Sequence, residues 1–425
     1  MAASLMAEAG LMGDAAAAAA RPVQIDPVPR VSIQAFCESP EVAAFVSAAV
    51  SDRRMAKAHV KQNTGGALAA VEAYKNAPTP NVILLEAPAE REALLAHLDE
   101  LSHSCDAGTK VIVLGRTNDI LLYRELMSRG VSDYLVPPFE VVDLVRAVSH
   151  LFRAPGVKPL GRLIAVVGAR GGVGASTVAH NLAWALSSAT EMATIIADFD
   201  LAFGTAGLNY NQDPPQGIAE AVFAPERVDG VLVDRLLSKC GEHLNLLAAP
   251  ATLDRVVDLT ETSFESLLDA LRASTPWAVL DLPHVWTSWA RRTLIAADEI
   301  VLVAGPDLAS LRNAKNLLDH VKIPRQNDHP PRLVLNGVGM LKRPEIAIAD
   351  FAKTVELEPV AVIPHDPKLF GAAANNGQMI AEIEGKGKIA EMFADLATRI
   401  AGRPEARKKK GFLDPLIASI SFLRS

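Results

Sequence analysis

The chain has 425 residues, of which 50% are hydrophobic, 5% aromatic and 21% charged, and its formal net charge is −7. This length predicts two or three domains with cores of their own, and the composition excludes the fibrous and wholly disordered classes. The acidic balance argues against a protein that coats nucleic acid non-specifically, because such binding needs many Lys and Arg side chains to displace phosphate counterions.

The three cysteines Cys37, Cys105 and Cys240 lack the spacing of a disulfide framework or a zinc cluster, which favours a reducing, cytoplasmic compartment. The apolar start of the chain has no basic segment and is interrupted by Glu8 and Asp14. No later stretch reaches the roughly 18 uncharged apolar residues of a membrane span. We therefore expect a soluble protein, at most associated with a membrane surface.

Residues 1–30 contain an alanine tract followed by prolines and show no amphipathic period, which predicts a disordered N-terminal tether. From residue 31 onward, short runs of branched residues alternate with helical stretches. Strands are expected within this region at 31–36, 81–87, 110–115 and 132–137. Five such units ending near residue 152 describe a small doubly wound α/β domain over 31–153.

A second domain follows a linker at 154–161, where two prolines and two glycines interrupt the pattern. Seven apolar runs typical of buried strands come next, at 162–168, 193–198, 244–249, 277–282, 299–304, 332–336 and 360–364. Such runs with helices between them predict a parallel sheet covered on both faces. The expected fold class is α/β, with two doubly wound parallel-sheet domains, the second over 162–402.

The sequence GARGGVGAST at 168–177 stands between an expected strand and an amphipathic helical stretch. A strand, a glycine loop and a helix start together point several backbone N–H groups at one anion, and the helix dipole adds favourable potential. Glycines are needed because a Cβ would block the approach of a phosphate or the positive φ angles of the loop. The sequence therefore predicts a phosphate-binding loop. The alternative is a glycine turn that only packs the helix onto the strand.

The loop lacks the cation that ends the usual P-loop. That motif ends in GKS or GKT, in which the Lys reaches the β- and γ-phosphates and the hydroxyl meets Mg²⁺. Here Ala175 takes the place of the Lys, while Ser176 supplies the hydroxyl. Nucleotide binding stays feasible, but no mobile cation follows the charge onto the leaving phosphate. We expect weak or absent hydrolysis of a bound nucleotide.

The loop resembles the arrangement xKGGxGK[ST] of the MinD/ParA-like P-loop ATPases. Arg170 stands at the position of their early signature Lys, which in that family reaches the nucleotide of the dimer partner. An Arg keeps the positive charge and offers a bidentate fork to a phosphate. The resemblance implies ATP as the ligand, bound by Arg170, Gly171, Gly172, Val173, Gly174, Ala175, Ser176 and Thr177.

Further motifs follow in the order that this family shows. The segment around Asp198 and Asp200 resembles the DxD element that positions Mg²⁺ and the attacking water, and Asp281 matches the Walker B carboxylate. The resemblance implies Mg²⁺ bound by Ser176, Asp198 and Asp281, partly through water, with Asp200 as a vestigial or weak catalytic residue. Each carboxylate alone is also consistent with an ordinary strand-end cap. Their joint placement at carboxyl ends of strands favours ligand binding.

Three weaker candidates lie near the end of the second domain. Asn336 occupies the adenine-reading position of the family, and Pro364 and Asp366 fall where its members close over the base. The resemblance implies contacts of these residues with the nucleotide. Their signal is weak, since Asn and Pro at strand ends are common turn residues.

Within this superfamily the stretches 168–186, 197–208, 296–319 and 363–380 are similar to CpaE/TadZ-type proteins of Flp/Tad pilus assembly, which often lack the last Walker Lys. The resemblance implies an ATP- and Mg²⁺-dependent homodimer that faces its copy across the nucleotide. Its implied partners are pilus and secretion assembly proteins at a cell pole, peripheral to the inner membrane, and no specific nucleic acid is expected.

Two other functions stay open at this point. One is a cycling ParA/MinD-type ATPase that works on chromosome partition or division sites, for which turnover is required. The other is a regulator that binds no nucleotide.

Residues 31–152 resemble a response-regulator receiver, most clearly at 128–151. A phosphate-accepting receiver needs an Asp after its third strand, acidic residues after the first and a Lys before the Pro of the fifth. Those places carry Glu86, Cys37 with Glu38, and Pro137, so phosphotransfer should fail. The missing Lys is expected to leave the Glu86 carboxylate without a partner. A docking or dimerisation module is the favoured interpretation, and a plain packing domain the alternative.

Residues 403–425 form a basic and amphipathic tail. Lys408, Lys409 and Lys410 precede apolar residues that recur at helical spacing from Pro415 onward. Such a helix can lie on an anionic membrane surface, and docking on the protein's own body or on a partner is equally consistent with the pattern.

Overall fold

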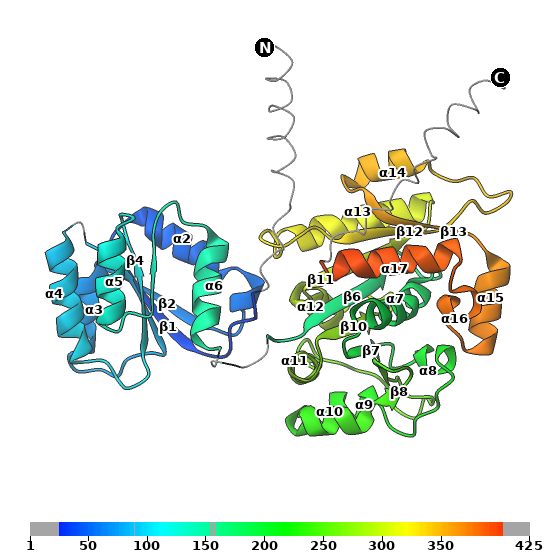
Figure 1. Ribbon diagram of the computed structural model, residues 1–425, viewed down its shortest axis with the longest axis horizontal. Coiled ribbons are helices and arrows are strands. Elements are labelled where there is room, and N and C mark those ends of the chain that lie inside the picture. Colours follow the sequence, from blue (N-terminus) through cyan, green and yellow to red (C-terminus); the bar gives the residue numbers. More distant parts are fainter. Residues whose placement is uncertain (1–24, 89, 154–155, 157–158, 403–425) are drawn as a thin grey trace, which may run out of the picture.

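The computed structural model describes residues 25–402 except 89, 154–155 and 157–158, and it contains two α/β domains (Figure 1). One has a five-stranded sheet and the other an eight-stranded sheet. The fold class expected from the sequence is confirmed. The basic and amphipathic tail and most of the expected linker lie outside the described residues. Within the described ranges, no helix is both long and apolar enough to cross a membrane.

The first domain has a parallel sheet of strand order β2-β1-β3-β4-β5, which is the flavodoxin-like doubly wound order. Apolar residues of β1 and β3 point alternately into two clusters, one on each face of the sheet. The elements are β1 (Ser32–Cys37), α2 (Pro40–Val50), η1 (Arg53–Met55), β2 (His59–Thr64), α3 (Gly66–Tyr74), β3 (Val82–Glu86), α4 (Arg91–Ser102), β4 (Lys110–Leu114), α5 (Ile120–Ser128), β5 (Asp133–Leu135) and α6 (Val141–Leu151).

Two features of this domain differ from the sequence-based expectation. Strand β2 was not anticipated, because its sequence HVKQNT is polar and it forms an edge of the sheet with no fully buried residue. The N-terminal tether was expected to extend to residue 30, but Ile25 and Val28 are buried in the core of this domain. The backbone N–H of Val28 also donates to the carbonyl of Arg54 at 2.8 Å. The remaining part of the expected tether, residues 1–24, is not described.

The second sheet has the order β13-β12-β11-β6-β10-β7-β9-β8. All seven expected strands are present, and the added edge strand β8 is a two-residue antiparallel piece, too short to leave a sequence pattern. The elements are β6 (Arg162–Gly168), α7 (Ala175–Thr190), β7 (Thr194–Asp198), α8 (Ala206–Asn209), α9 (Ile218–Val222), η2 (Pro225–Arg227), α10 (Gly230–Leu236), β8 (Ser238–Lys239), β9 (Leu244–Leu247), α11 (Glu265–Ser274), β10 (Trp277–Asp281), α12 (Ser288–Ala296), β11 (Glu299–Ala304), α13 (Leu308–Lys322), β12 (Arg332–Val338), α14 (Ile348–Val355), β13 (Pro359–Pro364), α15 (Pro367–Asn376), α16 (Ile380–Glu384) and α17 (Lys388–Ile400).

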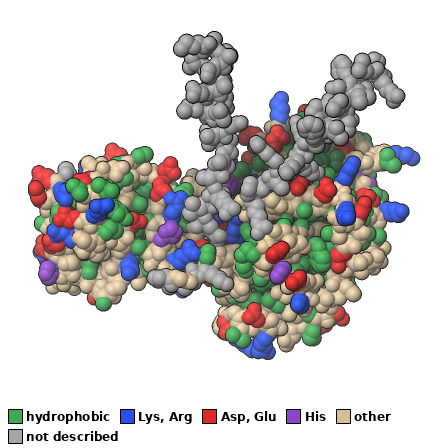
Figure 2. Space-filling model, in the orientation of Figure 1, with side chains coloured by type: hydrophobic (Ala, Val, Ile, Leu, Met, Phe, Trp, Pro, Cys, Tyr) green, Lys and Arg blue, Asp and Glu red, His purple; other side chains and the backbone are tan. Residues whose placement is uncertain are grey.

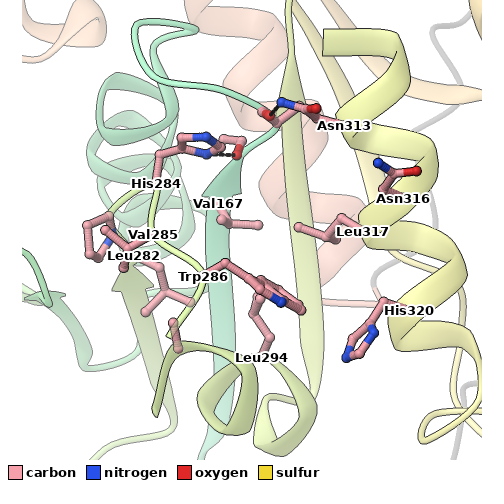
Figure 3. Close-up of a pocket in the computed structure, with 14 residues that line it drawn as sticks. Val167, Leu282, His284, Val285, Trp286, Leu294, Asn313, Asn316, Leu317 and His320 are labelled. Carbon is pink, nitrogen blue, oxygen red and sulfur yellow. Dashed lines mark hydrogen bonds between the residues drawn. The ribbon is translucent and has the colours of Figure 1, made fainter. Parts of the chain in front are cut away.

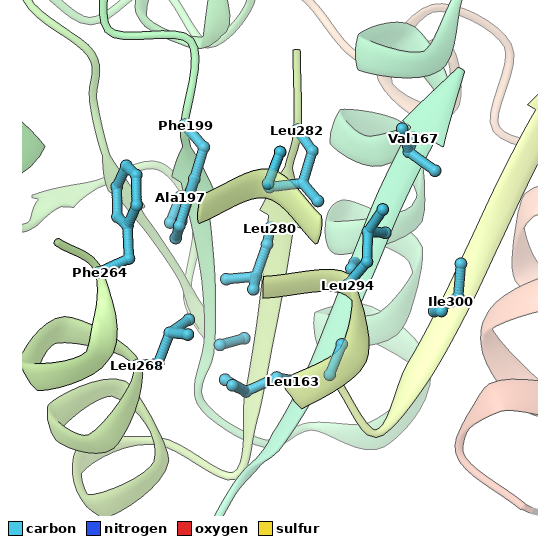
Figure 4. Close-up of a cluster of buried hydrophobic side chains, with 14 of the residues drawn as sticks. Leu163, Val167, Ala197, Phe199, Phe264, Leu268, Leu280, Leu282, Leu294 and Ile300 are labelled. Atoms are coloured by element: carbon cyan, nitrogen blue, oxygen red, sulfur yellow. The ribbon is translucent and has the colours of Figure 1, made fainter. Parts of the chain in front are cut away.

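Helices cover both faces of this sheet, which explains why its strands are apolar without alternation. In β6, Leu163 and Val167 belong to the cluster under α11, α12 and α13, where Phe199 stacks on Phe264 (Figure 4). Ile164 of the same strand points to the opposite cluster, under α7 and α17. The two helix layers leave the carboxyl ends of β6, β7 and β10 at one edge of the sheet, where the glycine loop lies.

A network of charged groups joins the two domains. Arg53, the first residue of η1, donates from Nη1 to the carbonyl oxygen of Ala296 at 3.0 Å and from Nε to Asp328 Oδ2 at 2.5 Å. Arg54 pairs with both Asp52 and Asp328. The side chains of Arg53, Arg54 and Asp328 are each less than a tenth exposed. The charged groups between the domains are therefore largely removed from water.

Candidate functional site

The glycine loop closes tightly at the start of α7. Gly172 and Gly174 adopt left-handed φ angles of 76° and 82°, which favour glycine. A Cβ on Gly174 would lie 2.5 Å from Nδ2 of Asn336. That amide donates to the carbonyl oxygen of Val173 at 2.8 Å. The structure thus brings Asn336 from β12 against the loop.

The first turn of α7 supplies the only candidate hydroxyls of the loop sequence, those of Ser176 and Thr177, both half-buried. The helix begins at Ala175, so its unpaired N–H groups lie at the end of the loop. Gly171 has open space where a Cβ would stand. These groups fit the binding of a phosphate through backbone and hydroxyl donors.

Asp198 and Asp281 end the neighbouring strands β7 and β10 and are paired in register. Their exposed fractions are 1% and 4%. Burial, together with the negative charge of Asp281, raises the pKa of Asp198 well above its usual range. Asp198 accepts hydrogen bonds from the backbone N–H groups of Asp200 at 3.1 Å and Ala206 at 3.0 Å. Two adjacent buried carboxylates favour a cation beside them.

Oδ1 of Asp281 is buried and, among the described residues, accepts no hydrogen bond. An unpaired carboxylate oxygen of this kind is a natural ligand for a hydrated Mg²⁺, and such ions are usually held by one or two carboxylates plus phosphates. The residues present therefore fit Mg²⁺ with Asp281, Asp198 and the hydroxyl of Ser176. When bound there, the ion would neutralise phosphate charge.

The other three sequence-predicted residues stand in a turn, at a strand end and at a helix cap. Asp200 is half-buried, and its Oδ1 accepts the backbone N–H of Phe203 at 3.0 Å, so that oxygen stabilises a turn. Pro364 ends β13, beside β12. Asp366 is the N-cap of α15, where it accepts the N–H of Leu369 at 2.9 Å. This capping bond explains Asp366 without a nucleotide.

Arg170 is directed at a carboxylate of its own chain. Its Nη2 lies 2.9 Å from Oδ2 of Asp307, the N-cap of α13, and Nη2 of Arg343 is 2.5 Å from the same oxygen. Burial would raise the pKa of Asp307, but its bonds with Arg170 and Ser310 outweigh this and lower the pKa to about 2. The carboxylate therefore stays charged at neutral pH and holds Arg170.

An apolar cavity of about 420 Å³ lies beside the loop, between α12 and α13 (Figure 3). Val167, Leu294 and Leu317 point into it, and Trp286 stands at its side. At its upper end in Figure 3, Nδ1 of His284 lies 3.0 Å from the carbonyl oxygen of Gly168. Asn313 donates to the carbonyl of Ala169 at 3.0 Å. These two side chains anchor the first residues of the loop to the segment after β10 and to α13.

The sequence reasoning missed several residues around the carboxylates. His180, within α7, is 1% exposed and lies 3.2 Å from Asp281. Gly204 leaves room for Asp198, because a Cβ there would lie 2.4 Å from Oδ2 of that residue. A buried His in an otherwise apolar helix face was a usable signal for His180. The role of Gly204 depends on a chain reversal that the sequence pattern does not show.

The first domain also contains a buried carboxylate, Glu86, that contacts several groups. Its Oε2 accepts the backbone N–H groups of Glu38 at 2.7 Å and Ser39 at 2.9 Å, and its side chain is 3% exposed. Nη2 of Arg116, which follows β4, lies 3.3 Å from Oε1. The expectation that Glu86 would have no partner was wrong, because the cation comes from a different strand end than the receiver Lys.

Replacing Glu86 by alanine is expected to destabilise the first domain by about 2 kcal/mol, since two partly buried N–H groups lose their acceptor and Arg116 loses a buried carboxylate. Thermal or denaturant unfolding measures this. Glu38→Ala is the matched control, because Glu38 contacts the same Arg116 at 3.5 Å from a position that is 40% exposed. That control should cost less than about 1 kcal/mol. Equal losses in the two variants would mean that Glu86 has no special structural role.

Comparisons with known proteins found matches to each of the two domains. The family model described as "AAA domain" matches residues 161–331. The septum site-determining protein MinD of Escherichia coli (strain K12) is 26% identical over 273 residues, 60% of this chain and 99% of that protein. The MinD structure complexed with Mg-ADP from Pyrococcus horikoshii, 20% identical with a TM-score of 0.50 over 57% of this chain and 96% of that one, shows the fold alone.

The N-terminal part gives a higher identity. It is similar to the crystal structure of the pilus assembly protein CpaE from Caulobacter crescentus, with 47% identity over 30% of this chain and 98% of that chain and a TM-score of 0.30. The sequence identity, over nearly the whole of that chain, carries the assignment. The chain therefore belongs to the family of CpaE pilus assembly proteins, with a receiver-like domain followed by a MinD/ParA-like P-loop ATPase domain.

Proposed function

We propose that the second domain binds ATP with Mg²⁺ at residues 168–177 and that the chain is a nucleotide-responsive scaffold for pilus assembly, with weak or no hydrolysis. The observation that carries the proposal is a closed glycine loop at a helix start in which Ala175 replaces the Walker Lys. Binding is supported by the loop N–H groups and by the unpaired oxygen of Asp281. Low turnover is supported by the missing ammonium.

A homodimer across the nucleotide is part of this proposal. In a single chain Arg170 pairs with Asp307 through Nη2, and its Nη1 donates to the carbonyl oxygen of Gly171 at 2.9 Å, so its donors are engaged within its own chain. We propose that ATP and a second copy draw Arg170 away from Asp307, while Arg343 keeps that carboxylate paired. Pilus and secretion assembly proteins are the proposed partners, at the cytoplasmic side of the inner membrane near a pole, with no specific nucleic acid.

Gly174→Val is expected to weaken ATP binding at least about tenfold, because a branched residue is strained at this φ angle and its Cβ would meet Asn336. Calorimetric titration with ATP and Mg²⁺ measures binding, and light scattering on a sizing column measures oligomeric state. The control is Gly171→Ala, since nothing lies within 4 Å of a Cβ at that position. Loss of binding and assembly together would tie the loop to assembly. Loss of neither would contradict the proposal.

A cycling ParA/MinD-type ATPase is the second candidate, favoured by the retained carboxylates Asp198, Asp200 and Asp281. A ParA-type protein also needs a basic surface for DNA. On the visible face of the described residues, Lys/Arg and Asp/Glu side chains are interspersed over both domains (Figure 2). DNA binding that weakens steeply with salt, together with ATP turnover, would favour this second candidate.

A further inference from the structure

His180 connects three elements around the Walker B carboxylate. It lies in the second turn of α7 and is 1% exposed. Its Nδ1 is 2.9 Å from Nδ2 of Asn209 at the end of α8, and its Nε2 is 3.2 Å from Oδ2 of Asp281 on β10. Tyr210 donates its hydroxyl to the backbone carbonyl of His180 at 2.7 Å.

The contact with Asn209 fixes which ring nitrogen carries the proton. An amide nitrogen can only donate, so Nδ1 of His180 accepts and carries no proton. The neutral ring then carries its proton on Nε2, which faces the carboxylate of Asp281. The Nε2 contact is not aligned as a full hydrogen bond, and Oδ1 of Asp281 has no partner among the described residues. One oxygen of Asp281 thus faces the ring, and the other is buried and unpaired among the described residues.

We propose that His180 is a positioning residue for Asp281: its Nε2–H holds Oδ2, which leaves Oδ1 directed at the Mg²⁺ of a bound nucleotide. This inference rests on the proposed nucleotide binding and deepens it. Outer partners of a metal ligand fix its orientation, and their loss typically costs 10–100-fold in metal affinity. The effect matters here because Ala175 supplies no ammonium, so Mg²⁺ provides the main neutralising charge for the phosphates.

The ring of His180 also connects Asp281 to α8, the helix that follows Asp198 and Asp200. Asn209 belongs to α8 (Ala206–Asn209), whose first N–H group donates to Asp198 at 3.0 Å. His180 therefore links the helix next to Asp198 with the side chain of Asp281. Asp198 and Asp281 are therefore held by one local network of side chains and backbone groups.

The test measures ATP binding by calorimetry over a series of Mg²⁺ concentrations, including excess chelator. His180→Leu is expected to raise the Mg²⁺ concentration needed for half-maximal ATP binding about 10–100-fold. His180→Gln should stay within a few-fold of the wild type, because its Oε1 can accept from Asn209 and its Nε2 can donate to Asp281. Tyr210→Phe, which leaves the ring in place, is the control and should leave the Mg²⁺ requirement unchanged.

Each outcome has one meaning. No ATP binding by the wild type at any Mg²⁺ concentration would defeat the proposed function. Binding with the same Mg²⁺ requirement in the wild type and the Leu variant would defeat the role of His180. If the Leu variant does not fold, Asn209→Ala takes its place, because it releases Nδ1 of the ring at a half-buried position. An unchanged Mg²⁺ requirement in that variant would overturn the proposal equally.

Discussion

Replacing Asp328 by alanine is expected to destabilise the folded chain by about 3–5 kcal/mol, because it removes the carboxylate that three buried guanidinium groups share. Asp328 contacts Arg53, Arg54 and Arg325, and its side chain is 6% exposed. Arg53 and Arg54 come from the first domain, whereas Arg325 comes from the second. The substitution should therefore weaken the contact between the domains as well as the stability of the loop that carries residue 328.

The charges around this residue explain the size of the expected effect. The other two carboxylates of the network, Asp52 and Asp298, already have partners in Arg54 and Arg272. Burial would raise the pKa of Asp298, but the charges of Arg272 and Arg53 outweigh it and lower the pKa to about 2. Without Asp328, Arg54 keeps Asp52 and Arg53 keeps a contact of 3.5 Å with Asp298. Arg325 keeps hydrogen bonds to backbone carbonyl oxygens.

Denaturant unfolding of the full chain measures the effect. Asp269→Ala is a matched control across the same domain contact, since Asp269 pairs with Lys57 but is 57% exposed. An exposed pair is worth at most about 1 kcal/mol, so the control should change little. If Asp328→Ala costs no more than this control, the buried network does not stabilise the chain.

The sequence could predict the strands that are buried on both faces, because continuous apolar runs such as LIAVV or WAVLD have few alternatives. It could not predict β2 and β8, which are polar or very short and depend on a neighbouring strand for their hydrogen bonds. The sequence could not predict the packing of Ile25 and Val28, because their segment is rich in proline and has no amphipathic period.

Among the site residues, sequence motifs located those that stand at strand ends or in the glycine loop. They did not locate residues that reach the site from elsewhere in the fold. Arg116 meets Glu86 from a different strand, and Asp307 meets Arg170 across 137 positions of the chain. His180 lies in a helix whose pattern indicates only a buried face. Pairings of this kind depend on the strand order, which the sequence pattern leaves open.

Replacing Ala175 by lysine is expected to raise the ATP turnover of the purified protein on the order of 100-fold. A single preorganised donor to the developing charge is typically worth that much, and Ala175 occupies the first position of α7, which accepts a lysine without breaking the helix. The added ammonium would meet the phosphates beside the existing N–H groups. Phosphate release under single-turnover conditions measures the chemical step.

Two further variants test whether the lysine acts through its charge and whether Asp200 takes part in the hydrolysis. Ala175→Gln adds a side chain of similar length without the charge, so it should leave turnover at the wild-type level. Asp200→Asn in the lysine background should remove most of the gain, if Asp200 keeps the role that the DxD resemblance implies. Wild-type turnover already equal to that of the lysine variant would contradict the scaffold assignment and favour a cycling ATPase. The same variants distinguish a scaffold from a cycling enzyme. A scaffold needs only ATP binding to assemble, whereas a cycling enzyme needs ATP hydrolysis to release its partner.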